Sequence, residues 1–238
     1  MRSFVTALAL FAATAVGAED LITFLNAATA ATRSNVPVRA QGVLVTTSPE
    51  GTVRDQLALV RRPNGDMYLE LHNSGVRALV LADGKALIVA KKGGSPETFA
   101  LDAALGGSEF TREDLRPFNA ELYRSPAIAD SSSEDVTVSL TPAQSQYALQ
   151  VLTFDRQKKV PVVVKNYKDT ANNLVKMRRN AGWVSVGGVW LPTDISMENF
   201  PMHVTSTATL HWQPTEDTPA LFDPAALGKP STLAWPAQ

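Results

Sequence analysis

The sequence predicts a mainly β protein with flanking helices (α+β), in which one strongly curved antiparallel sheet wraps around a helix. Three observations indicate this class. Short runs rich in β-branched residues recur along most of the 238-residue chain. Turn residues end nearly every run, and few segments carry a helical pattern. A closed barrel without an enclosed helix is the alternative for the same pattern.

The N-terminal segment has the features of an export signal. Arg2 precedes an apolar run over residues 4–15, and small residues at 16–18 match the positions that a signal peptidase reads. The run is too short to cross a bilayer, which needs about 20 apolar residues. We expect residues 1–18 to be a signal peptide cleaved after Ala18, and residues 19–238 to form one domain in the periplasm. A buried helix or a retained anchor is the alternative.

The composition excludes several kinds of site and partner. The chain has no cysteine, so disulfides and thiolate metal ligands are absent. It carries 22 Lys and Arg residues against 23 Asp and Glu residues. No run of basic residues is long enough to indicate a nucleic-acid interface. We therefore expect no nucleic-acid partner. We also expect a monomer.

The first half of the expected domain reads as a helix followed by a meander of strands. Apolar residues spaced by three and four positions predict a helix from Glu19 to about Arg33, and the sequence before Pro37 ends it. Turn residues then separate the strand runs, and Asn64-Gly65 is the strongest hairpin signal among them. The expected strands span residues 38–47, 53–62, 67–72, 76–82 and 86–91.

The second half resumes the strand pattern after a short helix. We expect that helix to begin at Thr111, a suitable N-cap that acidic residues follow. Residues 127–135 are polar and are expected to form a loop. The break at Gly187-Gly188 predicts a hairpin or a bulge, and a last helical turn is expected from Phe222. The further strands span residues 136–141, 146–155, 160–169, 174–179, 183–195 and 204–212. The total is roughly ten strands.

The sequence contains no pattern typical of a catalytic or metal site. His203 and His211 lie about 27 Å apart at the rise of a strand, so they cannot bind one metal together. The Gly-x-Ser-x-Gly turn that presents a nucleophilic serine is absent, and so is a glycine-rich phosphate loop. We therefore expect a protein that is not an enzyme and that has no catalytic residue, metal or cofactor.

What remains is apolar surface on alternate strand positions. Alternate residues of a strand share a face, and pairing in register brings such faces together. A filled sandwich core and an open cavity for alkyl chains both fit this pattern, because periodicity does not distinguish them. The residues predicted to form a ligand-binding face are Leu57, Leu59, Met67, Leu69, Leu71, Val80, Ile88, Leu149, Val151, Val162, Val164, Trp183 and Trp190.

Three segments carry motifs that together resemble one known family. Residues 108–115 read Ser-Glu-Phe-Thr-Arg-Glu-Asp-Leu, residues 160–167 place a proline before a run of β-branched residues, and residues 188–195 read Gly-Val-Trp-Leu-Pro-Thr-Asp-Ile. These motifs resemble those of the outer-membrane lipoprotein-sorting (LolA-like) family. The resemblance covers most of the expected domain in order. It implies an unclosed β half-barrel with helices covering the concave side.

The resemblance also implies a function in transport. Well-known members of the family take acylated lipoproteins from the inner membrane across the periplasm. A similar protein would bind acyl chains of a lipoprotein or lipid, with an inner-membrane exporter and an outer-membrane receptor as partners. Since each buried methylene contributes about 0.8 kcal/mol, two or three chains would bind tightly.

Two alternatives to a carrier stay open. The first is a non-carrier envelope module, either a sensor or a subunit of a lipid transport assembly, which uses the same sheet as a docking surface. The second is a periplasmic hydrolase whose site is assembled from residues far apart in the sequence.

Overall fold

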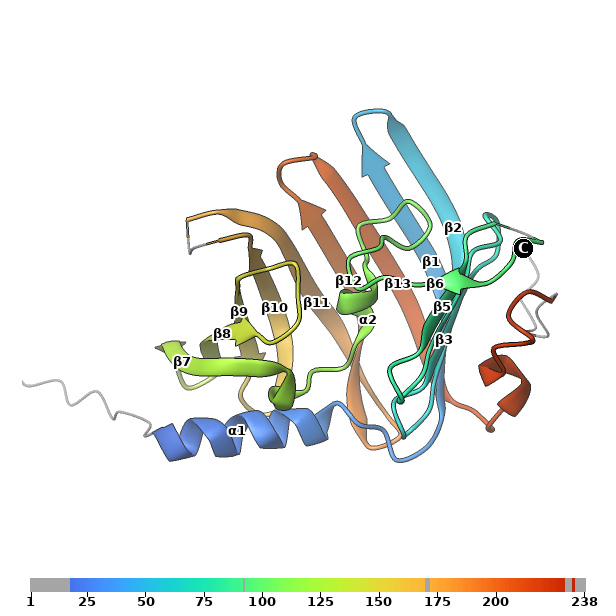
Figure 1. Ribbon diagram of the computed structural model, residues 1–238. Helices are drawn as coiled ribbons and strands as arrows, with labels where there is room; N and C mark the ends of the chain where they lie inside the picture. The colour runs from blue at the N-terminus through green and yellow to red at the C-terminus, as the bar shows by residue number, and fades with distance from the viewer. Residues whose placement is uncertain (1–17, 92, 170–171, 230–232, 234–238) are drawn as a thin grey trace, which may run out of the picture.

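The computed structural model describes residues 18–91, 93–169, 172–229 and 233 (Figure 1). These residues form an antiparallel sheet of thirteen strands. The strand order is β6-β5-β4-β3-β2-β1-β13-β12-β11-β10-β9-β8-β7. The sheet is strongly curved and unclosed, because β6 and β7 are its two edges. This confirms the expected half-barrel, and the closed-barrel alternative is wrong.

The strands follow the alternating pattern of the sequence. Strand β1 pairs with β13, so that the beginning and the end of the strand-forming sequence meet in the middle of the sheet. The bounds are β1 Val38–Ser48, β2 Gly51–Arg61, β3 Met67–Leu71, β4 Arg77–Val80, β5 Ala86–Val89, β6 Glu97–Thr98, β7 Tyr123–Ser131, β8 Asp135–Pro142, β9 Leu149–Asp155, β10 Val160–Tyr167, β11 Leu174–Val186, β12 Val189–Asn199 and β13 Val204–Pro214.

One long helix and a short one accompany the sheet. Helix α1 (Ala18–Ala31) buries Leu21, Leu25 and Ala28, whose spacing places them on one face. Helix α2 (Arg112–Leu115) lies in the segment that connects the two edges of the sheet (Figure 1). Two 3₁₀ turns, η1 (Ala120–Leu122) and η2 (Pro219–Phe222), complete the elements. No helix of the described residues has the length and apolar character needed to span a membrane.

Several expectations about the elements need correction. Residues 127–135 were expected to be a loop, but most of them belong to β7, an edge strand with two register shifts. Such a strand is exposed on both faces, so its sequence lacks apolar alternation. The 3₁₀ turn η2, which ends at Phe222, was not expected, whereas the turn expected after it is present, with the N–H of Ala225 donating to Oδ1 of Asp223. The predicted signal peptide lies outside the described residues, except for Ala18, the first residue of α1.

The two faces of the sheet are covered by different segments. On the concave side, Phe99, Leu105 and Phe110 pack on β1–β5, and α1 packs on β8–β10. On the convex side, Leu221 and Phe222 of η2 pack with alternate residues of β2–β5. Much of the concave side is therefore filled by the protein's own side chains.

Strands β1 and β13 approach each other closely at Gly42. A Cβ at this position would collide with the main-chain carbonyl of Thr209 on β13. Glycine is therefore required here by space, in the centre of the sheet.

Candidate ligand-binding cavity

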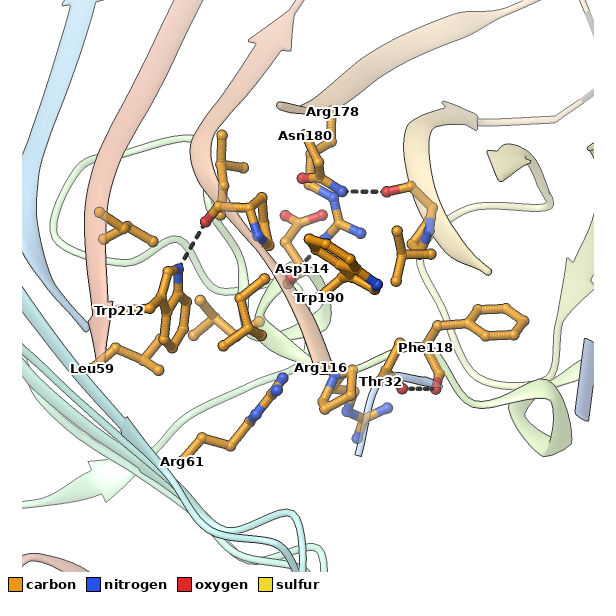
Figure 2. Close-up of a pocket in the computed structure, with 18 of the residues that line it drawn as sticks. Thr32, Leu59, Arg61, Asp114, Arg116, Phe118, Arg178, Asn180, Trp190 and Trp212 are labelled. Atoms are coloured by element: carbon orange, nitrogen blue, oxygen red, sulfur yellow. Dashed lines mark hydrogen bonds between the residues drawn. The ribbon is translucent and has the colours of Figure 1, made fainter. Parts of the chain in front are cut away.

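A cavity of about 150 Å³ remains on the concave side, partly open to solvent. It lies between β2, β10–β13 and the segment that carries α2 (Figure 2). Its walls include members of both concave apolar clusters, Phe110 from one and Phe118 from the other. The cavity thus occupies the junction of the two packed regions.

Three tryptophans, Trp183, Trp190 and Trp212, form much of the apolar wall. The indole N–H of Trp212 donates to the carbonyl of Pro192 at 2.8 Å, which fixes that ring (Figure 2). Trp190 is 40% exposed, and the Nζ of Lys158 lies 5.6 Å from the centre of its ring. Indole rings suit a boundary between an apolar space and water, because one edge is polar and the faces are not.

Three arginines, Arg61, Arg116 and Arg178, line the same cavity. Arg178 donates from Nη1 to the main-chain carbonyl of Asp114 at 2.7 Å. Arg61 ends β2 and extends into the cavity (Figure 2). Its Nη2 is shielded from solvent without a hydrogen-bond partner among the described residues, and burial lowers the pKa of Arg61 to about 10. The cavity therefore combines an apolar wall with cationic groups.

A buried ion pair holds α2 against the sheet beside the cavity. The Nζ of Lys176 on β11 lies 3.0 Å from Oδ2 of Asp114, and both side chains are less than a tenth exposed. The same Oδ2 accepts hydrogen bonds from the N–H and the hydroxyl of Thr111, at 2.9 and 2.8 Å. These bonds confirm Thr111 as the N-cap and position one wall of the cavity.

Glu113 forms a second polar contact between α2 and the sheet. Its Oε1 accepts a hydrogen bond from the hydroxyl of Ser145 at 2.6 Å, whereas its Oε2 is buried without a partner in the part of the chain that is described. Burial raises the pKa of this carboxyl, because the charged form loses water.

Within the described residues, no three His, Cys, Asp or Glu side chains are arranged to hold a metal ion.

The predicted ligand-binding residues fall into three groups. Leu59, Met67, Trp183 and Trp190 line the cavity. The larger group lies in closed apolar clusters: Leu57, Leu69, Leu71, Val80 and Ile88 pack with residues 99–110, and Val164 packs beneath α1. Ligand binding by any of these residues remains a prediction.

The third group lies away from the cavity. Leu149 and Val151 alternate on β9 with Gln150 and Leu152, which take the concave face, so the expected shared face is wrong for them. Both faces of β9 carry apolar residues, and the pattern alone did not fix which face is inside. Val162 lies at a register shift between Pro161 and Val163, where the alternation is interrupted.

The arginines were not predicted because only apolar strand positions were considered for the site, and Trp212 was not predicted although Trp183 and Trp190 were. A usable signal was present on β2, where Arg61 continues the inward alternation of Leu57 and Leu59. A charged residue at the end of an inward-facing apolar row is a candidate for ligand contact. Trp212 likewise follows Leu210 on the inward face of β13.

The volume of this cavity suits the end of a single alkyl chain. If a methylene takes roughly 30 Å³, similar to a water molecule's share of liquid volume, about 150 Å³ holds about five methylenes of one chain. Helix α1 and residues 99–110 pack against the concave face on either side of this cavity. Those segments were expected to cover the concave side, but they also pack deeply into it.

Comparisons with known proteins give one family match and several similar folds. A family described as "Uncharacterized protein" matches residues 96–229. Curated protein sequences give no match. A structure of a domain assigned to outer membrane lipoprotein sorting, from Vibrio parahaemolyticus, is 14% identical with a TM-score of 0.75, over 87% of this chain and 98% of that one.

Two further structures share the architecture. A DUF1329 family protein from Desulfovibrio piger is 12% identical with a TM-score of 0.73, over 86% of this chain and 96% of that one. A LolA superfamily protein from Nitrosomonas europaea is 15% identical with a TM-score of 0.66, over 85% and 96%. At these identities the likeness shows the fold, which is the LolA-like half-barrel.

Proposed function

Since the chain belongs to the family of uncharacterized proteins matched over residues 96–229 and has the LolA-like fold, we propose that it is a periplasmic lipid carrier. In this proposal, the half-barrel cavity binds an acyl chain of a lipoprotein or lipid and carries it toward the outer membrane. The observation that supports it most is the partly open hollow lined by tryptophan and aliphatic side chains on the concave side. Ligand sites are commonly concave and mostly apolar, with a few polar groups.

The size of the cavity limits the proposed cargo to one enclosed chain end. About five methylenes at about 0.8 kcal/mol each contribute about 4 kcal/mol, or roughly a thousandfold in affinity. The rest of a longer chain would lie at the open side of the cavity, near Trp190. A single inserted tail is therefore the proposed mode of binding.

We extend the proposal to the domain, export and partners of the carrier. The carrier is a monomeric, single-domain protein of residues 19–238, exported by the segment before it, and it is not an enzyme. An inner-membrane exporter would load it and an outer-membrane receptor would unload it. The fold of a lipoprotein-sorting domain is the structural support for this route.

A non-carrier envelope module is the second candidate function. It is favoured by the filling of the concave side, where Phe99, Leu105 and Phe110 occupy space that several acyl chains would need. In this candidate, the sheet docks another envelope component and the small cavity stays empty.

Extraction of the purified protein followed by mass spectrometry separates these two candidates. A carrier is expected to hold lipid after purification, and fluorescent fatty acids are expected to bind after its removal. Leu59→Glu should weaken that binding, because it places a carboxylate on the cavity wall, and Trp190→Glu should do so at a partly exposed site that tolerates the change. Val53→Glu, on an exposed position of β2, is the matched control. Lipid-free protein that binds no fatty acid would refute the carrier and favour the docking module.

A further inference from the structure

Arg61 lacks the interactions that normally accompany a buried charge. Its Nη2 is shielded from solvent, and the described residues offer it neither a hydrogen bond nor an ion pair. Buried charges in proteins are usually paired, because an uncompensated ion loses its hydration without replacement. The unmet bonding capacity of Arg61 faces the cavity (Figure 2).

The adjacent Arg62, which follows directly after β2, differs from Arg61 because its guanidinium has an ion-pair partner. It points to the other face of the sheet, where its Nη2 donates to Asp217 at 2.8 Å and its guanidinium lies 4.0 Å from the centre of the Phe222 ring. These contacts raise the pKa of Arg62, with the hydrogen bond to Asp217 as the largest cause. For Arg61, burial is the cause, and it lowers the pKa.

The other charged groups of the cavity leave it with a positive excess. Arg116 and Arg178 line the cavity together with one acid, Asp114. Asp114 is already paired with Lys176, which is itself cationic. Glu113, beyond the lining, interacts with Arg116 but is engaged by Ser145. Asp114 is thus paired with Lys176, Glu113 contacts Ser145 through Oε1, and neither acid pairs with Arg61.

We propose that Arg61, with Arg116 and Arg178 on the other walls of the cavity, binds the oxyanion head group of an alkyl ligand. The head group is a carboxylate or a phosphate ester, and the tail lies along the tryptophan wall. Guanidinium groups bind both kinds of oxyanion, commonly through two parallel hydrogen bonds. This inference rests on the proposed function, because it names the class of ligand that the same cavity takes.

Calorimetric titration with probes of one tail length tests the inference. The probes are dodecanoate, dodecyl phosphate, dodecanol and dodecyltrimethylammonium, each below its micelle concentration, with inorganic phosphate as the tail-free anion. Both anionic amphiphiles are expected to bind at least about tenfold more tightly than dodecanol, as charge-assisted hydrogen bonds allow. The cationic probe should bind most weakly, and inorganic phosphate should bind far less tightly than dodecyl phosphate.

The variant Arg61→Gln tests whether this side chain causes the preference for anionic amphiphiles over dodecanol. It is expected to bring dodecanoate to within a few-fold of dodecanol, because the affinity for dodecanoate falls far more than the affinity for dodecanol. Arg54→Gln, an exposed position of the same strand, is the matched control and should leave every affinity unchanged. Thermal melting without ligand is expected to show that Arg61→Gln is at least as stable, because it removes an unpaired buried charge.

The outcomes separate this inference from the function on which it rests. If dodecanol binds as tightly as the anions, or if Arg61→Gln keeps the preference, the head-group site is refuted and the carrier stands. If inorganic phosphate competes as well as dodecyl phosphate, the site takes free anions and the inference is refuted. If no probe binds, the carrier is refuted, and the head-group site with it.

Discussion

The dependence of affinity on the length of the ligand's alkyl chain reports how many carbons the cavity holds. The volume of the partly open cavity, about 150 Å³, corresponds to about five methylenes at roughly 30 Å³ each. Each methylene that leaves water contributes about 0.8 kcal/mol, which is about a fourfold change in Kd. We therefore expect affinity to rise about fourfold per carbon until the cavity is full, and about a thousandfold in total.

A series of unbranched fatty acids, titrated by calorimetry at one pH, gives this dependence. Longer chains should add little, because carbons beyond the enclosed volume stay in contact with water near Trp190. A negative heat-capacity change that grows with the same carbons would identify burial of apolar surface. No dependence on length would refute tail insertion, and a constant increment up to the longest chains would refute the size assigned to the cavity.

Three further predictions concern the frame around the cavity. Phe154→Ala should lower the free energy of unfolding in urea by about 3–5 kcal/mol, since this fully buried ring contacts Phe118 and Phe24 at 5.0 and 5.7 Å between ring centres. A loss of less than half that amount would mean that α1 is not packed on it. Gly42→Ala should cost about 1–3 kcal/mol, because a Cβ meets the carbonyl of Thr209; unchanged thermal melting would contradict the close approach of β1 and β13. Glu113→Gln should stabilise the protein at pH 7 and confer a smaller advantage as the pH falls toward 4.5, the ordinary pKa of the carboxyl. The sign follows because a raised folded-state pKa imposes its cost only above that ordinary value, and an equal advantage at both pH values would show that the effect is not ionisation.

The positions of elements that begin or end at turn residues or helix caps were predictable from the sequence. Gly187-Gly188 placed the β11–β12 hairpin, and Thr111 placed the start of α2. Local geometry decides both features, since positive φ favours glycine, and the carboxylate of Asp114 accepts hydrogen bonds from the N–H and the hydroxyl of the N-cap Thr111. The curved sheet followed from the number of such hairpins together with the family resemblance.

The features that long-range packing decides were not predictable. The inward row of β2 was identified, but whether Leu57 and Leu69 face a ligand or a covering segment depends on how deeply residues 99–110 insert. On β9, the inside and outside faces are both apolar, so Leu149 and Val151 were placed on the wrong side. Strand β7 was missed because an edge strand need not alternate.

A crystal structure of the protein with bound dodecanoate would show whether the cavity takes up an alkyl chain. We expect the alkyl tail between Trp183, Trp212 and Ile195, with the carboxylate on the guanidinium of Arg61. Protein that takes up dodecanoate only on its outer surface, with the cavity unchanged, would contradict it.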